Sequence, residues 1–478
     1  MKITTNKWLT ALVALTLLGS SCNKFLDVQP TGTLIEDKQF EDLQGFYDAL
    51  YGVYGSMAKK DLYGQHLSWG FVDRLGQITA RVREGELDYD LIHYRYGVRS
   101  VRNAIDAVWT NQYKAISYAN TLLAHCEKTS LTSPDIQWVR AEAMALRAYM
   151  HFDLLRLYCD DYRRKPESQG LPYAYVADLK NKKVYTLAET YANILADLDE
   201  AERLLADDNT IAAERNWSSS LRAGRVAHIN KYAVKAVKAR VYNAMGDATN
   251  AIKYAKEVIA SGQFALATSS TFAKVRRFPA EGELIFGLHN VALSESIVQT
   301  FLPAVQQRGD FAEANLSVAK LYNTTQFTPD NTDIRYNTYY LKKGGLHSFT
   351  RLMASEEELK LTATSLQGLC LIRLPEMYYI LAGNLYATNP AESRRYLNEL
   401  RQSRGLSALP ESYYATQADL DKELLSEYLR EFPGEGQAFY ALKYYNQTFT
   451  DVRGNRVNPS DDIFVLPWPE KELEFGNK

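Results

Sequence analysis

Two short helix patterns with almost nothing between them constrain the fold of this chain most strongly. Small and apolar residues recur at three- and four-residue steps across residues 232–244 and again across 250–260, which is the spacing that lines one face of a helix. The joint contains little more than Met245, Gly246 and Asp247. A joint this short brings the second helix back antiparallel to the first, so the pattern predicts a helical hairpin.

The same arrangement recurs near the C-terminus. Helix patterns over residues 377–387 and 392–401 flank a joint at residues 388–390, and Pro375 suits the first turn of the earlier helix. Each pair resembles a degenerate tetratricopeptide repeat, a helical hairpin that buries its apolar face against neighbouring hairpins. The sequence therefore predicts a protein dominated by α-helices, with tetratricopeptide-like hairpins as its scaffold.

Further helices are expected before and between these hairpins. Apolar stripes at helical spacing begin at Asp37, extend from Val101 to about Cys126, and follow Pro134. Another helix is expected to start at Thr186, because Glu189 stands three residues later and completes a capping box.

Two long inserts, residues 59–100 and about 262–370, break the helical pattern with dispersed glycines and many aromatic residues. We expect loop-rich segments there with minor β structure, and loops of this length in a compact protein are usually functional. Aromatic rings stack on sugar rings, whereas Asp, Arg and His side chains bond sugar hydroxyls. The alternative is that these rings fill the core beneath the loops. The candidate ligand-binding residues are Trp69, Asp73, Arg74, Tyr89, His93, Tyr94, Tyr96, Tyr336 and Tyr339.

The N-terminus has the order of a secretory signal. Lys2 and Lys7 precede an apolar stretch over residues 9–18. Small residues and then Cys22 follow this stretch, which is the order of a secretory signal. We predict a lipoprotein signal over residues 1–21, lipidation of Cys22, a flexible tether over 22–36 and a single domain over 37–478. An ordinary cleaved signal is the alternative, because Gly19 stands where lipoprotein signals usually carry Leu.

Composition and motifs exclude several other classes. The net charge is -2 and no long basic run occurs, so we expect no nucleic-acid partner. The chain has no HExxH, GxSxG, phosphate-binding glycine loop or paired CxxC motif, and we expect no metal or cofactor. We expect Cys126, Cys159 and Cys370 to be buried thiols.

One acidic cluster permits two interpretations. Glu427, Glu431 and Glu435 follow helical spacing with Arg430 between them, and Gly434 adjoins the end of this helix. Two carboxylates so placed could act on a glycosidic bond. Arg430 beside acids is equally the pattern of an ion-pair network, and this structural interpretation is the one we favour.

Several segments, in order along nearly the whole chain, together resemble the SusD/RagB family of nutrient-uptake lipoproteins. They are FLDVQP after Cys22, VWTNQYKAISYANTLL at 108–123, RAEAMALRAYMHFDLLRLYCD at 140–160, GLPY at 170–173, RLPEMYYILAGNLYA from Arg373, LNELRQSRGL from Leu397, EYLREFPGEGQAFYALKYYN from Glu427 and LPWPEKEL at 466–473.

The resemblance implies a SusD-like fold and a non-catalytic protein on the outer-membrane surface. It also implies a partner, a SusC-like TonB-dependent transporter that the protein covers as a lid. The expected ligand is an oligosaccharide, with a peptide as the alternative. A surface glycan hydrolase or lyase, and a helical-repeat scaffold that binds only protein, are two further alternatives. No ligand residue is implied, because family ligands bind in the variable inserts.

Overall fold

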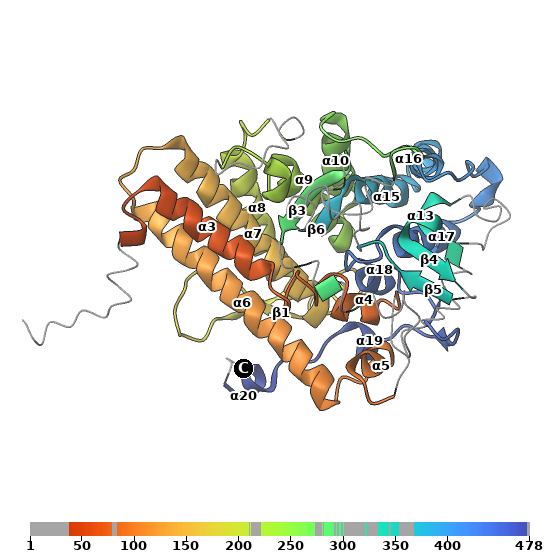
Figure 1. Cartoon of the computed structure of the whole chain (residues 1–478), viewed down its shortest axis with the longest axis horizontal. Coiled ribbons are helices and arrows are strands. Elements are labelled where there is room, and N and C mark those ends of the chain that lie inside the picture. Colours follow the sequence, from red (N-terminus) through yellow and green to blue (C-terminus); the bar gives the residue numbers. More distant parts are fainter. Residues whose placement is uncertain are drawn as a thin grey trace, which may run out of the picture.

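Long helices gather on one side of the molecule, and shorter helices and strands on the other (Figure 1). The computed structural model describes residues 38–78, 84–209, 221–272, 282–290, 333–343, 346–352 and 368–475, with isolated positions between them. The expected signal, the tether and Cys22 lie outside the described residues. Within the described ranges, no helix combines the length and apolarity that crossing a membrane requires.

The predicted helices of the first half are confirmed. Their bounds are α3 (Leu43–Met57), α6 (Arg99–Lys128), α7 (Pro134–Tyr158), α8 (Leu187–Leu204), α9 (Lys231–Met245) and α10 (Ala248–Ala260). The capping box before α8 forms as expected: Glu189 N donates to Thr186 Oγ1 at 3.1 Å, and Thr186 N donates to Glu189 Oε2 at 2.8 Å. A cap of this kind satisfies backbone groups that the first helical turn leaves without partners.

Both predicted hairpins are present. Between α9 and α10, Gly246 ends α9 at φ +78°, a backbone conformation that glycine adopts without strain. Asp247 then caps α10 by accepting from Asn250 N at 3.0 Å. The second hairpin pairs α15 (Leu374–Leu385) with α16 (Pro390–Ser403), and α10 packs against α15. The two hairpins therefore stack side by side, as the repeat pattern predicts.

The described parts of the inserts contain short helices as well as the minor β structure that we expected. Described parts of the first insert include α4 (Phe71–Leu75) and α5 (Leu87–Ile92). The second insert begins and ends as a buried strand pair, because β3 (Leu284–His289) runs antiparallel to β6 (Gly368–Arg373). Between them, α13 (Ile334–Tyr339) precedes the hairpin of β4 (Tyr340–Lys343) and β5 (Leu346–Phe349).

The remaining elements are short, apart from one long helix near the C-terminus. They are β1 (Gln169–Pro172), β2 (Val184–Thr186), α17 (Gln417–Glu431), α18 (Ala438–Tyr445), β7 (Phe449–Thr450), β8 (Arg456–Val457), α19 (Asp461–Phe464) and α20 (Glu470–Phe475), with single 3₁₀ turns at Arg225–Ala227 and Glu411–Tyr413. The last helix lies near α6 (Figure 1).

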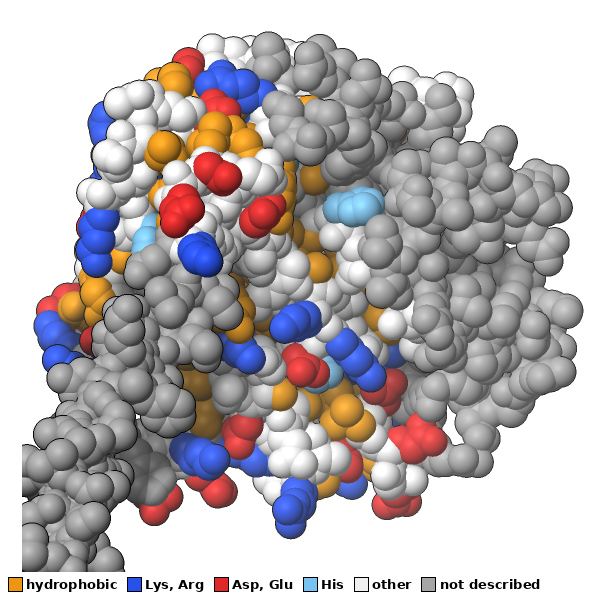
Figure 2. All heavy atoms as spheres, turned by 60° about the vertical axis from the view of Figure 1, so that its left-hand side comes forward, with side chains coloured by type: hydrophobic (Ala, Val, Ile, Leu, Met, Phe, Trp, Pro, Cys, Tyr) orange, Lys and Arg blue, Asp and Glu red, His pale blue; other side chains and the backbone are white. Residues whose placement is uncertain are grey.

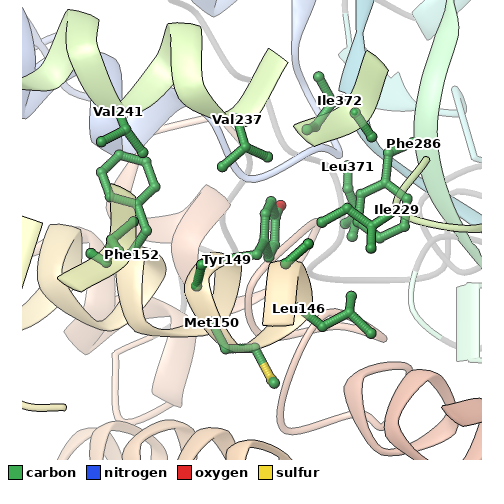
Figure 3. Close-up of a cluster of buried hydrophobic side chains, with 14 of the residues drawn as sticks. Leu146, Tyr149, Met150, Phe152, Ile229, Val237, Val241, Phe286, Leu371 and Ile372 are labelled. Atoms are coloured by element: carbon green, nitrogen blue, oxygen red, sulfur yellow. The ribbon is translucent and has the colours of Figure 1, made fainter. Parts of the chain in front are cut away.

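The hydrophobic core lies where the helical scaffold meets the β3–β6 pair. In Figure 3, Phe152 of α7 points toward Val241 of α9, and Tyr149 of α7 points into the space between α9 and the two strands. Tyr149 and Phe152 are at most 1% exposed, as are Val237 and Phe286. The expected thiols Cys126, Cys159 and Cys370 are free and buried. Because the strands are buried on both faces, they read in sequence as continuous apolar runs.

A buried ion network joins the second insert to the C-terminal helices. Its members are Arg335, Arg351, Arg373, Arg401, Arg404, Arg430, Glu283, Asp333, Glu423, Glu427, Glu431 and Glu435, each at most 6% exposed. Glu431 accepts from Arg373 Nη1 at 2.8 Å, from Arg404 Nε at 2.9 Å and from Arg335 Nη1 at 3.2 Å. These arginines hold the pKa of Glu431 well below its usual range. The ion-pair interpretation of Glu427, Glu431 and Glu435 is confirmed.

A buried carboxylate also fastens the first insert to the C-terminal part. Asp73 in α4 accepts from Gly434 N at 2.6 Å and from Gly436 N at 3.2 Å. Both glycines have positive φ, and a Cβ at position 436 would lie 2.3 Å from the Leu67 carbonyl oxygen. Burial raises the pKa of Asp73 to about 7, and the two backbone N–H groups only partly offset this rise.

We predict that Glu431→Gln destabilises the protein by about 3–5 kcal/mol, because a neutral amide leaves Arg373 and Arg404 buried with less opposing charge. Chemical denaturation measures this change. Glu399→Gln is the matched control, since Glu399 pairs with Arg395 at 2.7 Å on the exposed face of α16 and should matter little. Equal stability of both variants would contradict a structural role for the network.

We predict that Asp73→Asn removes a component of the pH dependence of stability. The pKa of Asp73 is higher in the folded than in the unfolded protein, so its contribution is fully present below about pH 4 and is lost as pH rises toward 7. The free energy of unfolding of the wild type, minus that of the variant, should therefore fall across this range. A flat difference from pH 4 to 8 would show that burial does not raise this pKa.

Candidate ligand-binding site

Three of the candidate residues in the first insert lie in the interior. Trp69 is 1% exposed and donates from Nε1 to Gly64 O at 3.0 Å. Arg74 is 4% exposed, and its Nε donates to Asp88 Oδ2 at 2.8 Å. With Asp73 committed to the Gly434–Gly436 turn, all three side chains have partners within the chain. A role for them in direct ligand contact stays a prediction, and the geometry gives them a structural one.

The candidates of the second insert are buried as well. Tyr336 is 4% exposed and Tyr339 is fully buried. The Tyr336 ring stacks on Tyr322, with centroids 5.1 Å apart and planes at 13°. Both tyrosines share a hydrophobic cluster with Trp69. The aromatic residues of the two inserts therefore meet, but they meet as a core beneath the surface.

The remaining candidates form a partly exposed cluster on and after α5. Tyr89 and His93 are half-buried, and their rings lie 4.3 Å apart at 44°. The His93 ring nitrogen Nδ1 is hydrogen-bonded to Tyr89 O at 2.6 Å, because α5 places residues four apart on one face. The guanidinium of Arg95 lies 5.1 Å from the centre of the Tyr89 ring. This arrangement places the Tyr89 ring beside the imidazole of His93 and beneath the guanidinium of Arg95.

Backbone conformations of positive φ support this cluster. Tyr94 has φ +54° and Gln77 has φ +61°, both in a region that residues other than glycine rarely adopt. The two side chains are hydrogen-bonded, since Gln77 Nε2 donates to Tyr94 Oη at 2.9 Å. Tyr94 Oη in turn donates to Leu75 O at 3.0 Å. Such strain is kept only where the surroundings enforce it, and it gathers at functional sites.

Residues near the C-terminus complete the same surface. Arg453 Nη1 lies 3.4 Å from His93 Nε2, and Val452 N donates to Gln77 Oε1 at 3.2 Å. Tyr96, only 9% exposed, anchors the cluster by donating to Ile463 O at 2.6 Å. Sequence reasoning missed Gln77 and Arg453, because no local pattern shows that residue 453 returns to residue 93. We call Tyr89, His93, Tyr94, Arg95 and Arg453 the α5 surface.

The α5 surface suits binding through stacking and hydrogen-bond donation. A tyrosine face stacks on a flat ligand, and two guanidinium groups with a histidine donate to hydroxyl or carbonyl oxygens. Asp90, which is 7% exposed, accepts from Arg95 Nη1 at 3.3 Å and helps to position that guanidinium. Among the described residues, no group of three His, Cys, Asp or Glu side chains is arranged to hold a metal ion.

Comparisons with known proteins place both halves of the chain in one family. A family profile described as "Starch-binding associating with outer membrane" matches residues 24–242, and the profile of the SusD family matches residues 240–472. SusD-like protein P2 of Formosa agariphila is 24% identical over 206 residues, which span 41% of this chain and 37% of that protein.

Solved structures agree on the fold. A SusD superfamily protein of Bacteroides thetaiotaomicron superposes with a TM-score of 0.66 at 19% identity, covering 90% of this chain and 97% of the other. Surface glycan-binding protein A of Bacteroides uniformis gives 0.64 at 17% identity, covering 90% and 97%. At such identities the likeness establishes the fold alone. Together the two family profiles account for almost the whole chain, which therefore belongs to the SusD/RagB family.

Proposed function

We propose that this protein captures an oligosaccharide at the outer-membrane surface and delivers it, without catalysis, to a SusC-like TonB-dependent transporter that it covers as a lid. The α5 surface carries the proposal, because it combines a tyrosine ring with guanidinium donors. The backbone at Tyr94 has a positive φ that the surrounding structure must hold in place. The description of the matching family and the name of the B. uniformis relative support a glycan as the ligand.

The state of the acid cluster supports a binding role. Glu427 and Glu431 are fully buried and held by arginines, which keep the pKa of each well below its usual range. A general acid of a glycosidase needs the opposite, a raised pKa beside the glycosidic bond. The low pKa values therefore support a structural rather than a catalytic role for this cluster.

Surface charge gives no support for a nucleic-acid ligand. Figure 2 shows acidic and basic side chains interspersed over the described part of one face, with apolar groups between them. The net charge of -2 agrees with this mixture. No broad basic field of the kind that binds nucleic acid covers the described part of that face.

The proposal includes the anchoring of the mature protein. Signal cleavage before Cys22 and lipidation of its thiol would attach the chain to the outer membrane, with residues 22–36 as a tether. Residues 37–478 would then form one domain that moves over the transporter while it stays attached. A tether of this length with Pro30 and Gly32 lets the domain change its orientation.

We predict that Tyr89→Ala weakens glycan binding about tenfold, because stacking of this kind is worth roughly 1–1.5 kcal/mol. Isothermal titration calorimetry against a panel of soluble glycans measures the affinity. Tyr118→Ala is the matched control, since Tyr118 is an exposed tyrosine on α6, 41% accessible and outside the α5 surface.

Two results would count against glycan capture at this surface. The first is no binding to any glycan of the panel by the wild-type protein. The second is equal affinity of Tyr89→Ala and the wild type. Enrichment of peptides from a digest by the purified protein, lost in Tyr89→Ala, would replace the oligosaccharide with a peptide as the ligand.

We predict that Cys22→Ala moves the protein from the membrane fraction to the soluble fraction, because the lipid is lost, while glycan affinity is unchanged. Fractionation followed by immunoblotting measures the distribution. The wild-type protein is the control. Retention of the variant in the membrane fraction would mean that a protein partner, rather than the lipid, holds it there.

A further inference from the structure

A cavity separate from the α5 surface lies where the helical scaffold meets the C-terminal helices. The space that the centre of a water-sized sphere can reach inside it is about 80 Å³, and the cavity is partly open to solvent. Its walls come from α7, α8 and α9 on one side and from α15, α17 and α18 on the other. No residue of the α5 surface lines it. The cavity therefore belongs to the junction of two parts of the fold, a common place for ligand sites.

Aromatic rings dominate the walls of this cavity. The rings are Phe152, Tyr162, Tyr191, Tyr428, Tyr440, Tyr444 and Tyr445. The guanidinium of Arg156 lies between two of them, 3.6 Å from the centre of the Tyr440 ring and 4.9 Å from that of Phe152. The cavity can thus hold an apolar or flat body close to a cation.

Three side chains of the lining keep polar atoms without hydrogen-bond partners. They are Arg156 Nε, Arg240 Nη1 and Tyr440 Oη, all shielded from solvent. Arg240 and Tyr440 are 4% and 8% exposed. Buried polar atoms are nearly always paired, and an unpaired one carries a desolvation penalty, so three in one lining require an explanation.

The rest of each guanidinium is in use. Arg240 makes a bidentate pair with Glu376 at 2.6 Å and 2.6 Å, and its guanidinium also lies near the Tyr149 hydroxyl. Arg156 binds Asp153, and its Nη1 donates to Gln437 Oε1 at 3.3 Å. What each arginine has left is a donor, so the missing partner is an acceptor.

The other charges of the lining point the same way. Asp160 and Asp161 are paired with cations outside the cavity, Lys165 at 3.0 Å and Arg163 at 2.9 Å. Lys443 is 6% exposed, and its Nζ donates to Arg156 O at 2.7 Å and to Cys159 O at 2.6 Å. The acids are thus neutralised, whereas donors remain in excess.

We propose that this cavity is a second ligand site, which takes the carboxylate of an organic acid that carries a ring. The carboxylate accepts from Arg156 Nε, Arg240 Nη1 and the Tyr440 hydroxyl, which becomes possible when the lining side chains shift slightly as the ligand enters. The ring packs among the tyrosines and Phe152. Guanidinium and carboxylate groups match in geometry, and their hydrogen bonds gain strength away from water. The site is independent of the α5 surface and of the glycan proposed there.

Two acids with the same carboxylate test the proposal and separate its possible sources. Glucuronate represents a sugar acid and benzoate an aromatic acid, with glucose and benzyl alcohol as their uncharged counterparts. Calorimetry on the mature protein should show that at least one acid binds, and that its counterpart binds at least about tenfold more weakly. Binding of neither acid, or equal binding of acid and counterpart, would overturn the proposal.

Tyr440→Phe locates the binding. The variant should weaken the affinity for the acid about tenfold while leaving the thermal unfolding midpoint unchanged or raised, because the deleted hydroxyl has no partner in the unliganded protein. Tyr118→Phe on α6 should change neither quantity. Unchanged affinity in Tyr440→Phe, or a clearly lowered midpoint, would overturn the proposal, since a lowered midpoint means that the hydroxyl already has a partner. Tyr89→Ala should retain the acid binding. A failure of the glycan proposal at the α5 surface can therefore be told apart from a failure of the acid proposal at the cavity.

Discussion

Glu431 sits fully buried among three arginines that come from distant parts of the chain, and the architecture depends on this contact. Arg373 ends β6, Arg404 follows α16, and Arg335 belongs to the second insert, so a single carboxylate draws these segments to the end of α17. Ions in the interior lose much hydration, and attraction compensates only when every partner is in place. A misplaced segment would leave a buried charge unpaired, which makes the network selective for one arrangement.

The same network explains why the family segments look as they do. Arg373 comes from RLPEMYY, Arg401 and Arg404 from LNELRQSRGL, and Glu431 and Glu435 from EYLREFPGEG. Read separately, these segments are an amphipathic helix start, a basic helix end and an acidic helix end. In three dimensions, the arginines of the first two segments form ion pairs with the glutamates of the third. Arg373, Arg401 and Arg404 are therefore long-range packing residues rather than surface charges.

Rigid attachment of the inserts determines which of their aromatic residues reach the surface. Asp73 ties α4 to the Gly434–Gly436 turn, and this attachment draws Trp69 into a core shared with Tyr336 and Tyr339. Tyr89 and His93, which follow Asp73 by 16 and 20 residues, are partly exposed instead. The composition of the insert predicted aromatic contacts, but only packing divided the rings between core and surface.

Local spacing in the sequence was enough to predict the helices, the capping box at Thr186 and the two hairpins, because three- and four-residue periodicity and capping chemistry act within a few residues. The buried cysteines were expected on another ground, the scattered and odd number of thiols after Cys22. The choice between ion pairing and catalysis at Glu431 was predicted in favour of pairing, but its partners were not. The tertiary structure alone decided that Arg453 meets His93, that Gln77 supports Tyr94, and that Arg156, Arg240 and Tyr440 line one cavity. Those contacts join residues tens to hundreds of positions apart. A pattern among neighbouring residues does not show which distant segment will pack against them.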